Sequence, residues 1–355
     1  MNIDRTFVAL PQDDEQRAGH GSHLCQGLYH VAAGAPAPRT AFIASHYNVD
    51  FAEHYLAEPL ARRGFGFLGW NTRFRGNEGY FLLEHAIADI ALGARWLREQ
   101  GVERLVLLGN SGGGSLMAAY QARSRDDDLL EPGELYVSLA AHPGRPQVLT
   151  AWMDASVTDE FDPTKTDPAL DIFNPGNGPP YQSDFVATYR AAQEARNRRI
   201  TTWAKAERER LRAAGLKDRV FTVQRTWADP RMVDPSLDPS DRPTPACYLG
   251  DPALANRGVF GIGIMSTIRT WLSMWSLDDS DCGGAEHLAE IALPALVVQA
   301  TMDTGVFPSD AAAILAALGS NDKQLVELPG DHYFRTPAGA RDALADLLAD
   351  WVANR

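Results

Sequence analysis

The sequence predicts an α/β protein built on one mostly parallel β-sheet with helices on both faces. Short apolar segments typical of strands alternate with segments of helical periodicity over residues 40–140, and the same alternation resumes over residues 295–353. These strands are nearly continuous apolar runs, which is typical of strands that are buried on both faces. The alternation stops between about residues 145 and 290, where no strand of that kind recurs.

The first half of the predicted sheet has strands at residues 40–45, 65–70, 104–108 and 135–140. Helices connect them at residues 51–63, 82–100 and 115–123. Pro59 lies inside the first of these helices and must kink or interrupt it. The second helix is the most distinct, because apolar residues recur at positions 83, 87, 90, 94 and 97, the spacing of one helical face. Gly101 ends it.

The second half of the sheet is predicted near the end of the chain, with strands at 295–300 and 323–328 and helices at 309–318 and 338–353. Between the halves lie a polar helix at 183–214, a Pro- and Asp-rich loop at 228–245 and a tryptophan-rich apolar segment at 258–277. Because both halves belong to one sheet, we interpret the intervening residues as an insertion. The expected organisation is a core of residues 1–144 and 291–355, with a helical cap of residues 145–290.

Composition and charge exclude several classes of protein. The formal net charge is −13, and an acidic chain repels phosphate backbones and anionic lipid, so neither nucleic acid nor a membrane is an expected partner. No apolar run is long enough for a membrane helix, and residues 1–10 lack the features of a signal peptide. The three cysteines, Cys25, Cys247 and Cys282, show no metal-binding or disulfide spacing. We therefore expect a cytoplasmic protein without a metal or cofactor.

The most specific motif is Gly109-Asn110-Ser111-Gly112-Gly113. It follows a predicted strand and precedes a predicted helix, which is the context of a G-x-S-x-G nucleophile elbow. The turn of such an elbow is so tight that the serine is strained, and the glycines let the strand and the helix approach closely. The hydroxyl of Ser111 is then presented at the carboxyl edge of the sheet, above a helix N-terminus that favours developing negative charge.

A serine nucleophile needs a base, and the base needs a group that orients it. His332 follows the last predicted strand and Asp303 follows the strand before it, so both lie at strand carboxyl ends, where ligand chemistry gathers in α/β sheets. The chain order Ser111, Asp303, His332 is the order that accompanies a nucleophile elbow. Asp331 is the rival acid, but a residue adjacent to His332 cannot easily fold back onto its ring. Asp303 is therefore the predicted orienting residue.

These motifs resemble the α/β-hydrolase superfamily, and the resemblance extends over essentially the whole predicted core. It implies the α/β-hydrolase fold and an oxyanion hole, in which the backbone N–H of Gly112 is one expected donor. The other donor would come from the loop Ser45-His46-Tyr47-Asn48, where His46 lies at the place of the family's His-Gly and Tyr47 replaces the glycine. Either Tyr47 or Asn48 supplies this N–H, and their side chains are further candidates.

The triad and the resemblance together predict a serine hydrolase acting on a small-molecule acyl substrate. Ser111 attacks the carbonyl of an ester or thioester, an acyl-enzyme forms, and water activated by His332 releases the acid. A serine nucleophile excludes the family branches that use a carboxylate, the haloalkane dehalogenases and epoxide hydrolases. The alternatives are an acyltransferase or a carbon–carbon bond hydrolase with the same triad, and a ligand-binding protein on an inactive scaffold.

The cap is predicted to select the substrate through residues 258–277. Large apolar residues there recur at helical spacings of three or four, which indicates one broad apolar helix face: Phe260, Ile264, Ile268, Trp271 and Trp275. Such a face either packs the cap onto the core or lines a pocket above Ser111. Trp271 and Trp275 are the predicted substrate-binding residues.

Overall fold

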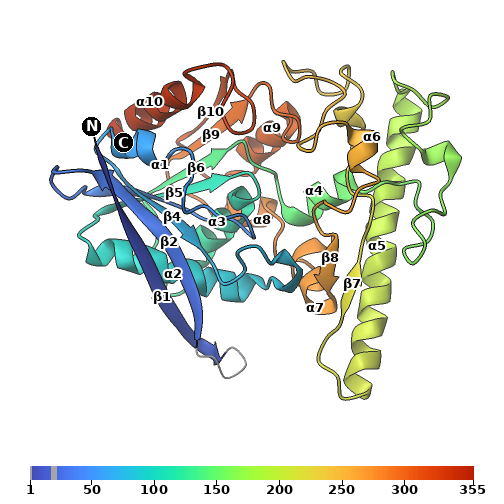
Figure 1. Cartoon of the computed structure of the whole chain (residues 1–355), viewed down its shortest axis with the longest axis horizontal. Coiled ribbons are helices and arrows are strands. Elements are labelled where there is room, and N and C mark those ends of the chain that lie inside the picture. The colour runs from blue at the N-terminus through green and yellow to red at the C-terminus, as the bar shows by residue number, and fades with distance from the viewer. Residues whose placement is uncertain (1, 17–21) are drawn as a thin grey trace.

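A computed structural model describes residues 2–16 and 22–355 of the chain. Eight strands form one sheet in the order β1-β2-β4-β3-β5-β6-β9-β10, and two short strands form a second sheet (Figure 1). The strands of the large sheet are Ile3–Gln16 (β1), Ser22–Ala32 (β2), Thr40–Ala44 (β3), Gly66–Asn71 (β4), Arg104–Asn110 (β5), Leu135–Leu139 (β6), Ala295–Ala300 (β9) and Lys323–Leu328 (β10). The second sheet pairs Val220–Thr222 (β7) with Met265–Thr267 (β8).

The α-helices are Ala57–Ala61 (α1), Leu83–Glu99 (α2), Gly113–Arg123 (α3), Arg145–Trp152 (α4), Ser183–Ala213 (α5), Pro252–Ala255 (α6), Ile268–Thr270 (α7), Ala285–Ala289 (α8), Pro308–Ala317 (α9) and Ala340–Ala353 (α10). Short 3-10 turns span Glu78–Tyr80, Pro168–Leu170 and Pro230–Met232, and a π-helical turn spans Trp271–Trp275. Among the residues that the structure describes, no helix combines the length and the apolar character needed to cross a membrane.

The large sheet confirms the predicted fold class. Strands β4, β3, β5, β6, β9 and β10 pair in parallel, whereas β1 and β2 form an antiparallel edge. Because β6 and β9 are neighbours in the sheet, the chain leaves the sheet after β6 and re-enters it directly beside β6, as β9. The segment between these two strands, residues 140–294, extends away from the sheet, and α5 is the labelled helix farthest from it (Figure 1). We call these residues the inserted segment.

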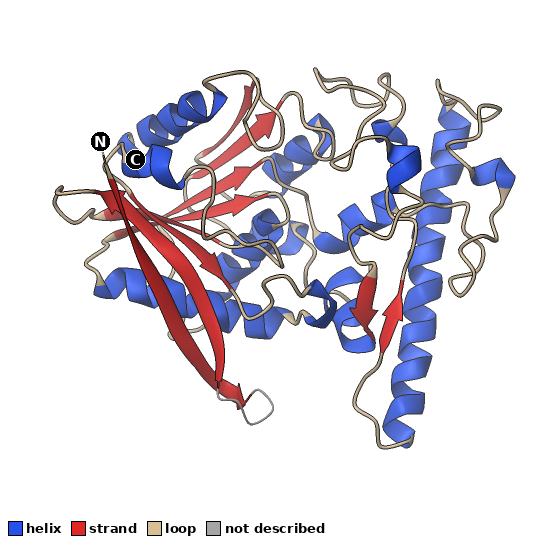
Figure 2. Ribbon diagram, in the orientation of Figure 1, coloured by secondary structure: helices blue, strands red, loops and turns tan. Residues whose placement is uncertain are grey.

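Helices cover both faces of the sheet (Figure 2). Alternate side chains of β5 belong to two cores: Leu105 and Leu107 pack in a cluster with residues of α2 and α3, whereas Val106 and Leu108 pack with residues of α1 and α10. Every residue of β4 and of β9 is buried. Burial on both faces explains why the parallel strands are unbroken apolar runs in the sequence.

The hairpin of β1 and β2 is absent from the predicted elements. Its two faces differ in exposure: Val8 is 4% and Phe7 is 63% exposed, and Cys25 is 0% and Leu24 is 58% exposed. Because most described residues of β1 are exposed, and buried and half-buried residues alternate over residues 25–29 of β2, the hairpin has no continuous apolar run of the kind that identifies the central strands. A period of two in the sequence was the signal that could have revealed it.

The predicted apolar helix face at residues 258–277 is wrong. Residues 258–264 form no helix, β8 follows them, and within the segment helical turns occur only over residues 268–275. Phe260 is 74% exposed, whereas Trp271 and Trp275 are fully buried. Three glycines explain the difference, since glycine disfavours a helix interior and Gly263 adopts a φ of 68°. The first predicted helix, at 51–63, is likewise reduced to the single turn of α1.

Candidate active site

Ser111 lies in a tight turn between β5 and α3, with its side chain partly exposed. Its φ of 57° is the strained conformation expected of a nucleophile elbow. The Ser111 N–H donates to the Leu139 carbonyl oxygen at 3.0 Å, and its own carbonyl oxygen accepts from the His142 N–H at 3.2 Å. A Cβ at Gly109 would lie 2.5 Å from the Cα of Gly114, so only glycine permits this approach of strand and helix. The elbow is thus fixed by backbone bonds to the end of β6 and to the loop that follows it, and by a glycine contact.

His54 supports the elbow, and sequence reasoning missed it. Its Nε2 lies 3.1 Å from the Oδ1 of Asn110, and its Nδ1 accepts the N–H of Leu56 at 3.2 Å. The Nδ2 of Asn110 donates to the Leu139 carbonyl oxygen at 2.9 Å. Burial lowers the pKa of His54 to about 4, so the ring is neutral and its Nε2–H donates to Asn110. His54 therefore orients the residue that precedes Ser111.

Asp303 and His332 form a buried hydrogen-bonded pair at the carboxyl ends of β9 and β10. The Nδ1 of His332 lies 2.6 Å from the Oδ2 of Asp303. The other oxygen, Oδ1, accepts the N–H groups of Gly305 and Val306 at 2.9 and 3.0 Å. With Asp303 only 1% exposed, these bonds fix the carboxylate in one orientation. The arrangement places a proton on Nδ1 and leaves Nε2 of His332 as an acceptor.

Asp331, the rival acid, is directed elsewhere. Its Oδ1 accepts the N–H of Arg335 at 2.6 Å, and its Oδ2 pairs with the Nε of the same arginine at 3.0 Å. The hydrogen bond to His332 is made by Asp303 alone of these two carboxylates.

Tyr248 from the inserted segment touches both members of this pair. Its hydroxyl donates to the Oδ1 of Asp303 at 3.1 Å and lies 3.0 Å from the Nδ1 of His332. The rings of Tyr248 and His332 are 4.5 Å apart between centroids. Burial raises the pKa of Tyr248, and the Asp303 charge raises it further, so the phenol keeps its proton. Sequence reasoning missed this residue, which lies in a loop with no repeating pattern.

Ser111 and His332 are not joined by a hydrogen bond in the described chain. They share one neighbourhood, since His142, whose N–H bonds to Ser111, interacts electrostatically with His332. Hydrogen bonds between a nucleophile and its base commonly tighten only when substrate is bound.

The backbone N–H groups of the predicted oxyanion loop differ in whether they are hydrogen-bonded. The N–H groups of Asn48 and Val49 both donate to the Nδ1 of His46, at 3.3 and 3.2 Å. The hydroxyl of Tyr47 pairs with the Oγ of Ser115 at 3.0 Å inside the core, so this side chain points away from the site. The Tyr47 N–H has no hydrogen-bond acceptor among the described residues. Tyr47, rather than Asn48, therefore keeps a backbone donor available.

Gly112, the other predicted donor, is surrounded by His46 and Arg145. A Cβ at Gly112 would lie 2.8 Å from the Nε2 of His46 and 2.9 Å from the Nη1 of Arg145. Arg145 is 3% exposed and forms an ion pair with Glu78 at 3.0 Å. Its guanidinium also lies over the rings of Tyr47 and Trp275, 4.9 and 4.5 Å from their centroids. A glycine after the nucleophile is thus required by a buried cation and an imidazole.

The two predicted substrate-binding tryptophans have different surroundings. Trp271 donates from Nε1 to the Oγ1 of Thr201 at 3.0 Å, and its ring meets that of Phe221, so its contacts lie within the inserted segment. Trp275 contacts Arg145 and in that way borders the site. The structure brings Trp275, but not Trp271, to the group of residues around Gly112.

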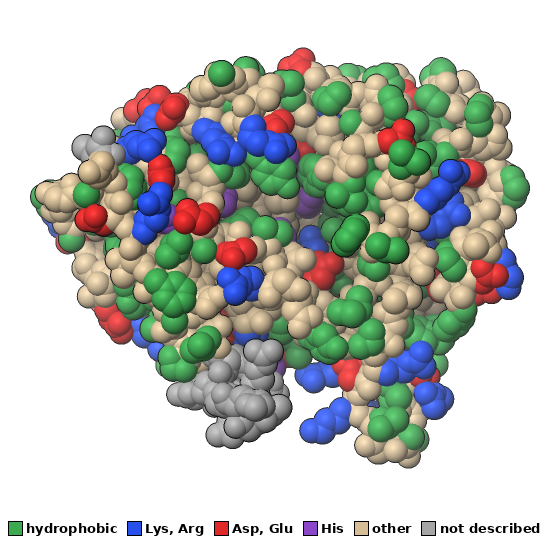
Figure 3. Space-filling view, viewed as in Figure 1, with side chains coloured by type: hydrophobic (Ala, Val, Ile, Leu, Met, Phe, Trp, Pro, Cys, Tyr) green, Lys and Arg blue, Asp and Glu red, His purple; other side chains and the backbone are tan. Residues whose placement is uncertain are grey.

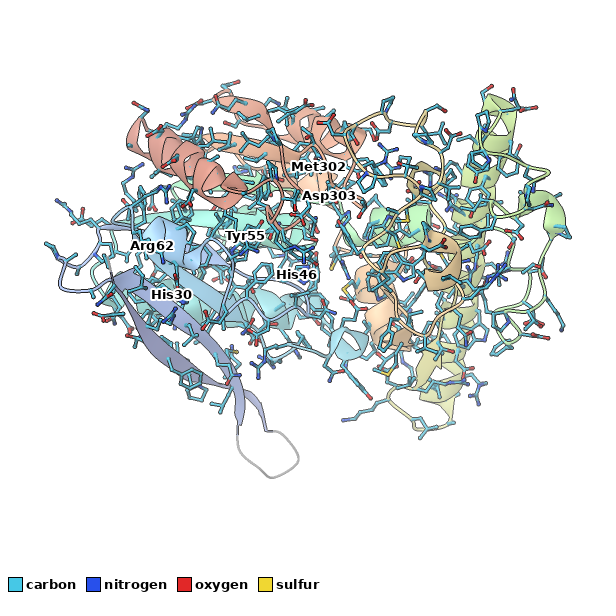
Figure 4. The ribbon with its side chains drawn as sticks, turned by 45° about the horizontal axis from the view of Figure 1, so that its top comes forward. His30, His46, Tyr55, Arg62, Met302 and Asp303 are labelled. Atoms are coloured by element: carbon cyan, nitrogen blue, oxygen red, sulfur yellow. The ribbon has the colours of Figure 1, made fainter. Side chains whose placement is uncertain are left out.

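The molecular surface is hollowed beside the candidate site. Figure 3 shows a hollow between the core and the inserted segment, with histidine atoms in its depth and apolar side chains around it. Figure 4 shows that Asp303 and His46 lie at the edge of the core that faces the inserted segment, whereas His30 lies away from it on β2. The candidate site is therefore enclosed by the carboxyl edge of the sheet and by the inserted segment.

Neither a comparison with protein-family models nor one with curated proteins found a match for this chain. Solved structures do match. The esterase domain of a Rhodothermus marinus protein is 13% identical with a TM-score of 0.51, over 100% of this chain and 99% of that one. The α/β hydrolase GrgF from Penicillium sp. sh18 is 13% identical with a TM-score of 0.55, over 99% and 98%. DcsB, solved in complex with its substrate analogue, is 14% identical with a TM-score of 0.56, over 99% of each chain. The chain thus has the α/β-hydrolase fold, which confirms the fold that its motifs predicted.

Proposed function

We propose that the protein is a serine hydrolase that cleaves a carboxylic ester or thioester through an acyl-enzyme on Ser111. The observation that carries this proposal is the combination of a strained serine elbow with the buried pair of Asp303 and His332 at the same sheet edge. A strained serine alone marks a turn, and a buried Asp–His pair alone is a common structural feature. Together they supply a nucleophile, a base and the group that orients the base.

We assign each step of the proposed reaction to a residue. Asp303 holds the proton of His332 on Nδ1, so Nε2 accepts the proton of Ser111 as its oxygen attacks the acyl carbon. The oxyanion that forms is stabilised by the N–H groups of Gly112 and Tyr47. His332 then protonates the leaving alcohol or thiol. In the second half of the proposed reaction, His332 deprotonates a water molecule. This water attacks the acyl-enzyme and releases the carboxylic acid.

The inserted segment completes the proposed site. We assign residues 145–290 the role of a cap that covers Ser111 and admits a small acyl substrate through the hollow in Figure 3. Trp275 borders the site through Arg145, so we assign it a part in shaping the acyl pocket. Trp271 supports the cap from within, through its bond to α5.

The decisive experiment is covalent labelling with a fluorophosphonate, followed by hydrolysis of p-nitrophenyl esters of increasing acyl length. Wild-type protein should be labelled at Ser111, and Ser111→Ala should lose labelling and at least on the order of 10⁴-fold in kcat. Ser124→Ala, at the far end of α3, is the matched control and should behave as wild type. Labelling of Ser111→Ala, or hydrolysis near the wild-type rate, would exclude Ser111 as the nucleophile.

A further inference from the structure

We infer that the side chain of His46 is a member of the oxyanion hole, donating its Nε2–H to the negatively charged oxygen formed on the substrate. This inference rests on the proposed function, because the oxyanion exists only if Ser111 attacks an acyl carbonyl. Backbone N–H groups are the usual donors at such a site. An imidazole that adds to them would be a catalytic residue specific to this loop sequence.

The hydrogen bonds of the loop fix the tautomer of His46. Two backbone N–H groups, those of Asn48 and Val49, donate to its Nδ1 at 3.3 and 3.2 Å. A ring nitrogen that accepts hydrogen bonds carries no proton, so the proton of the neutral ring is on Nε2. Burial lowers the pKa of His46 well below its usual range, and the Arg145 cation lowers it further. The ring is therefore a neutral donor that cannot compete with His332 as a base.

The position of this donor suits an oxyanion held by Gly112. The Nε2 of His46 would lie 2.8 Å from a Cβ at Gly112. A Cβ is roughly 2.5 Å from its own backbone nitrogen, which limits the separation of Nε2 from the Gly112 nitrogen to about 5.3 Å. Two donors that each lie roughly 2.7–3.1 Å from one oxygen are at most about 6 Å apart. The separation of the two nitrogens therefore permits one oxygen to accept from both groups.

The Nε2–H of His46 is fixed in position and has no hydrogen-bond acceptor among the described residues. The ring of His46 is 5.3 Å from that of Phe51 between centroids, and the residue is 6% exposed, so the imidazole has little freedom to turn. Among the described residues no hydrogen-bond acceptor is provided for its Nε2–H. The ring lies at the edge of the core that faces the inserted segment (Figure 4). A fixed N–H without a protein acceptor, beside the residue after the nucleophile, is the arrangement of a preorganised donor.

Arg145 is the neighbouring alternative, because its Nη1 lies 2.9 Å from the same Cβ position. Its Nη2 is committed to Glu78, and its plane lies over the rings of Tyr47 and Trp275. We assign Arg145 the role of keeping His46 neutral and His46 the role of donor. The two residues can be separated by substitutions at position 46 alone.

The test compares His46→Asn with His46→Gln. The asparagine oxygen can take the place of Nδ1 and hold the loop, but it supplies no donor at the Nε2 position, whereas the glutamine amide supplies that donor and loses the loop acceptor. We expect His46→Asn to lower kcat for p-nitrophenyl acetate by about 10²- to 10³-fold with little change in KM, and His46→Gln to stay within about tenfold of wild type. The reverse order would show that His46 only holds the loop, and wild-type rates in both variants would overturn the inference.

A binding measurement covers the case in which a variant folds less well. A boronic acid that forms a tetrahedral, negatively charged adduct with Ser111 should bind His46→Asn at least about tenfold more weakly than His46→Gln. The carboxylic acid product, which is planar and forms no bond to Ser111, should show a smaller difference between the two variants than the boronic acid does. Equal boronate affinities would overturn the inference. If wild-type protein forms no adduct with fluorophosphonate, the proposed function fails and the role of His46 falls with it; adduct formation with an unaffected His46→Asn rejects His46 alone.

Discussion

The hydroxyl of Tyr248 donates a hydrogen bond to the Oδ1 of Asp303 across 3.1 Å, so a side chain of the inserted segment contacts the acid of the proposed triad. The ring of the tyrosine lies against His332 and presses closely on Gly305, where a Cβ would be 2.4 Å from its Cζ. The inserted segment therefore supplies a third hydrogen bond to this carboxylate oxygen, beside those from the N–H groups of Gly305 and Val306.

Tyr248→Phe should lower kcat by about tenfold and leave KM for a short ester nearly unchanged. The substitution removes one hydrogen bond to a buried carboxylate while keeping the ring in place, and tenfold corresponds to about 1.4 kcal/mol of lost transition-state stabilisation. Tyr333→Phe is the control, since Tyr333 packs against His332 at 4.9 Å without a bond to Asp303. Steady-state kinetics of both variants give the answer. A wild-type kcat in Tyr248→Phe would mean that the backbone donors suffice to hold Asp303.

Asp303→Asn should cost at least about tenfold more in kcat than Asp331→Asn, and a loss on the order of 10⁴-fold is the expectation for an orienting aspartate. An amide at position 303 would donate to the Nδ1 of His332 and so move the ring proton to Nε2. That nitrogen could then no longer accept the proton of Ser111. Asp331 bonds to Arg335, so its substitution should affect only that turn. Hydrolysis of p-nitrophenyl acetate by the two variants measures the difference. Equal losses would transfer the orienting role away from Asp303.

A site residue could be predicted when its signal lies in a short stretch of sequence, and not when it depends on a contact between distant residues. Ser111, Asp303 and His332 could be identified as candidates because each follows its own strand within a few residues, and the topology of an α/β sheet brings strand ends together. Tyr248 could not be found, since it reaches Asp303 from 55 positions away through an irregular loop. His54 was missed for a related reason: its role depends on a bond to Asn110 that no spacing reveals.

The inserted segment shows the opposite error, in which a pattern was present and the structure did not follow it. Phe260, Ile264 and Ile268 have helical spacing, but the glycines between them and the pairing of β8 with β7 prevent a helix. In this segment the low helix propensity of glycine outweighed the helical spacing of the apolar residues. In the oxyanion loop the sequence left Tyr47 and Asn48 as equal candidates. The structure uses the Asn48 N–H in a bond to His46, which is the reason that we propose Tyr47 as the donor.

Glu78→Gln should destabilise the protein by about 3–5 kcal/mol, because it leaves the buried guanidinium of Arg145 without its counter-charge. Glutamine can still accept the Gly263 N–H that the Oε1 of Glu78 accepts at 3.0 Å, so the loss isolates the charge. Urea unfolding gives the free energy. Glu99→Gln, at the exposed end of α2, is the control and should change stability by less than about 0.5 kcal/mol. Equal small effects would show that Arg145 is compensated by its aromatic contacts.

His54→Gln should make the protein less sensitive to acid. Burial lowers the pKa of His54 to about 4 in the folded protein, whereas a histidine in the unfolded chain titrates near about 6.5, so the unfolded state binds the proton first as pH falls. The stability that the neutral ring contributes is complete above about pH 6.5 and is lost progressively down to about pH 4. A difference of this size corresponds to roughly 3 kcal/mol for this residue alone. His46 and His142 have pKa values lowered by burial as well, so the wild-type loss should be larger than that of one group.

Glutamine is the suitable replacement because its amide can donate to the Oδ1 of Asn110, as the Nε2–H of His54 does at 3.1 Å, without titrating. Urea unfolding at pH 8 measures the structural cost of the substitution, since His54 is neutral there in both states. Unfolding at pH 5 then adds the cost of keeping the ring unprotonated, which only the wild type bears. We therefore expect the free energy of unfolding to fall between pH 8 and pH 5 by about 2 kcal/mol less in His54→Gln than in wild type. Parallel losses in the two proteins would mean that His54 is already able to take up a proton in the folded state, and that the elbow is not held by a neutral ring.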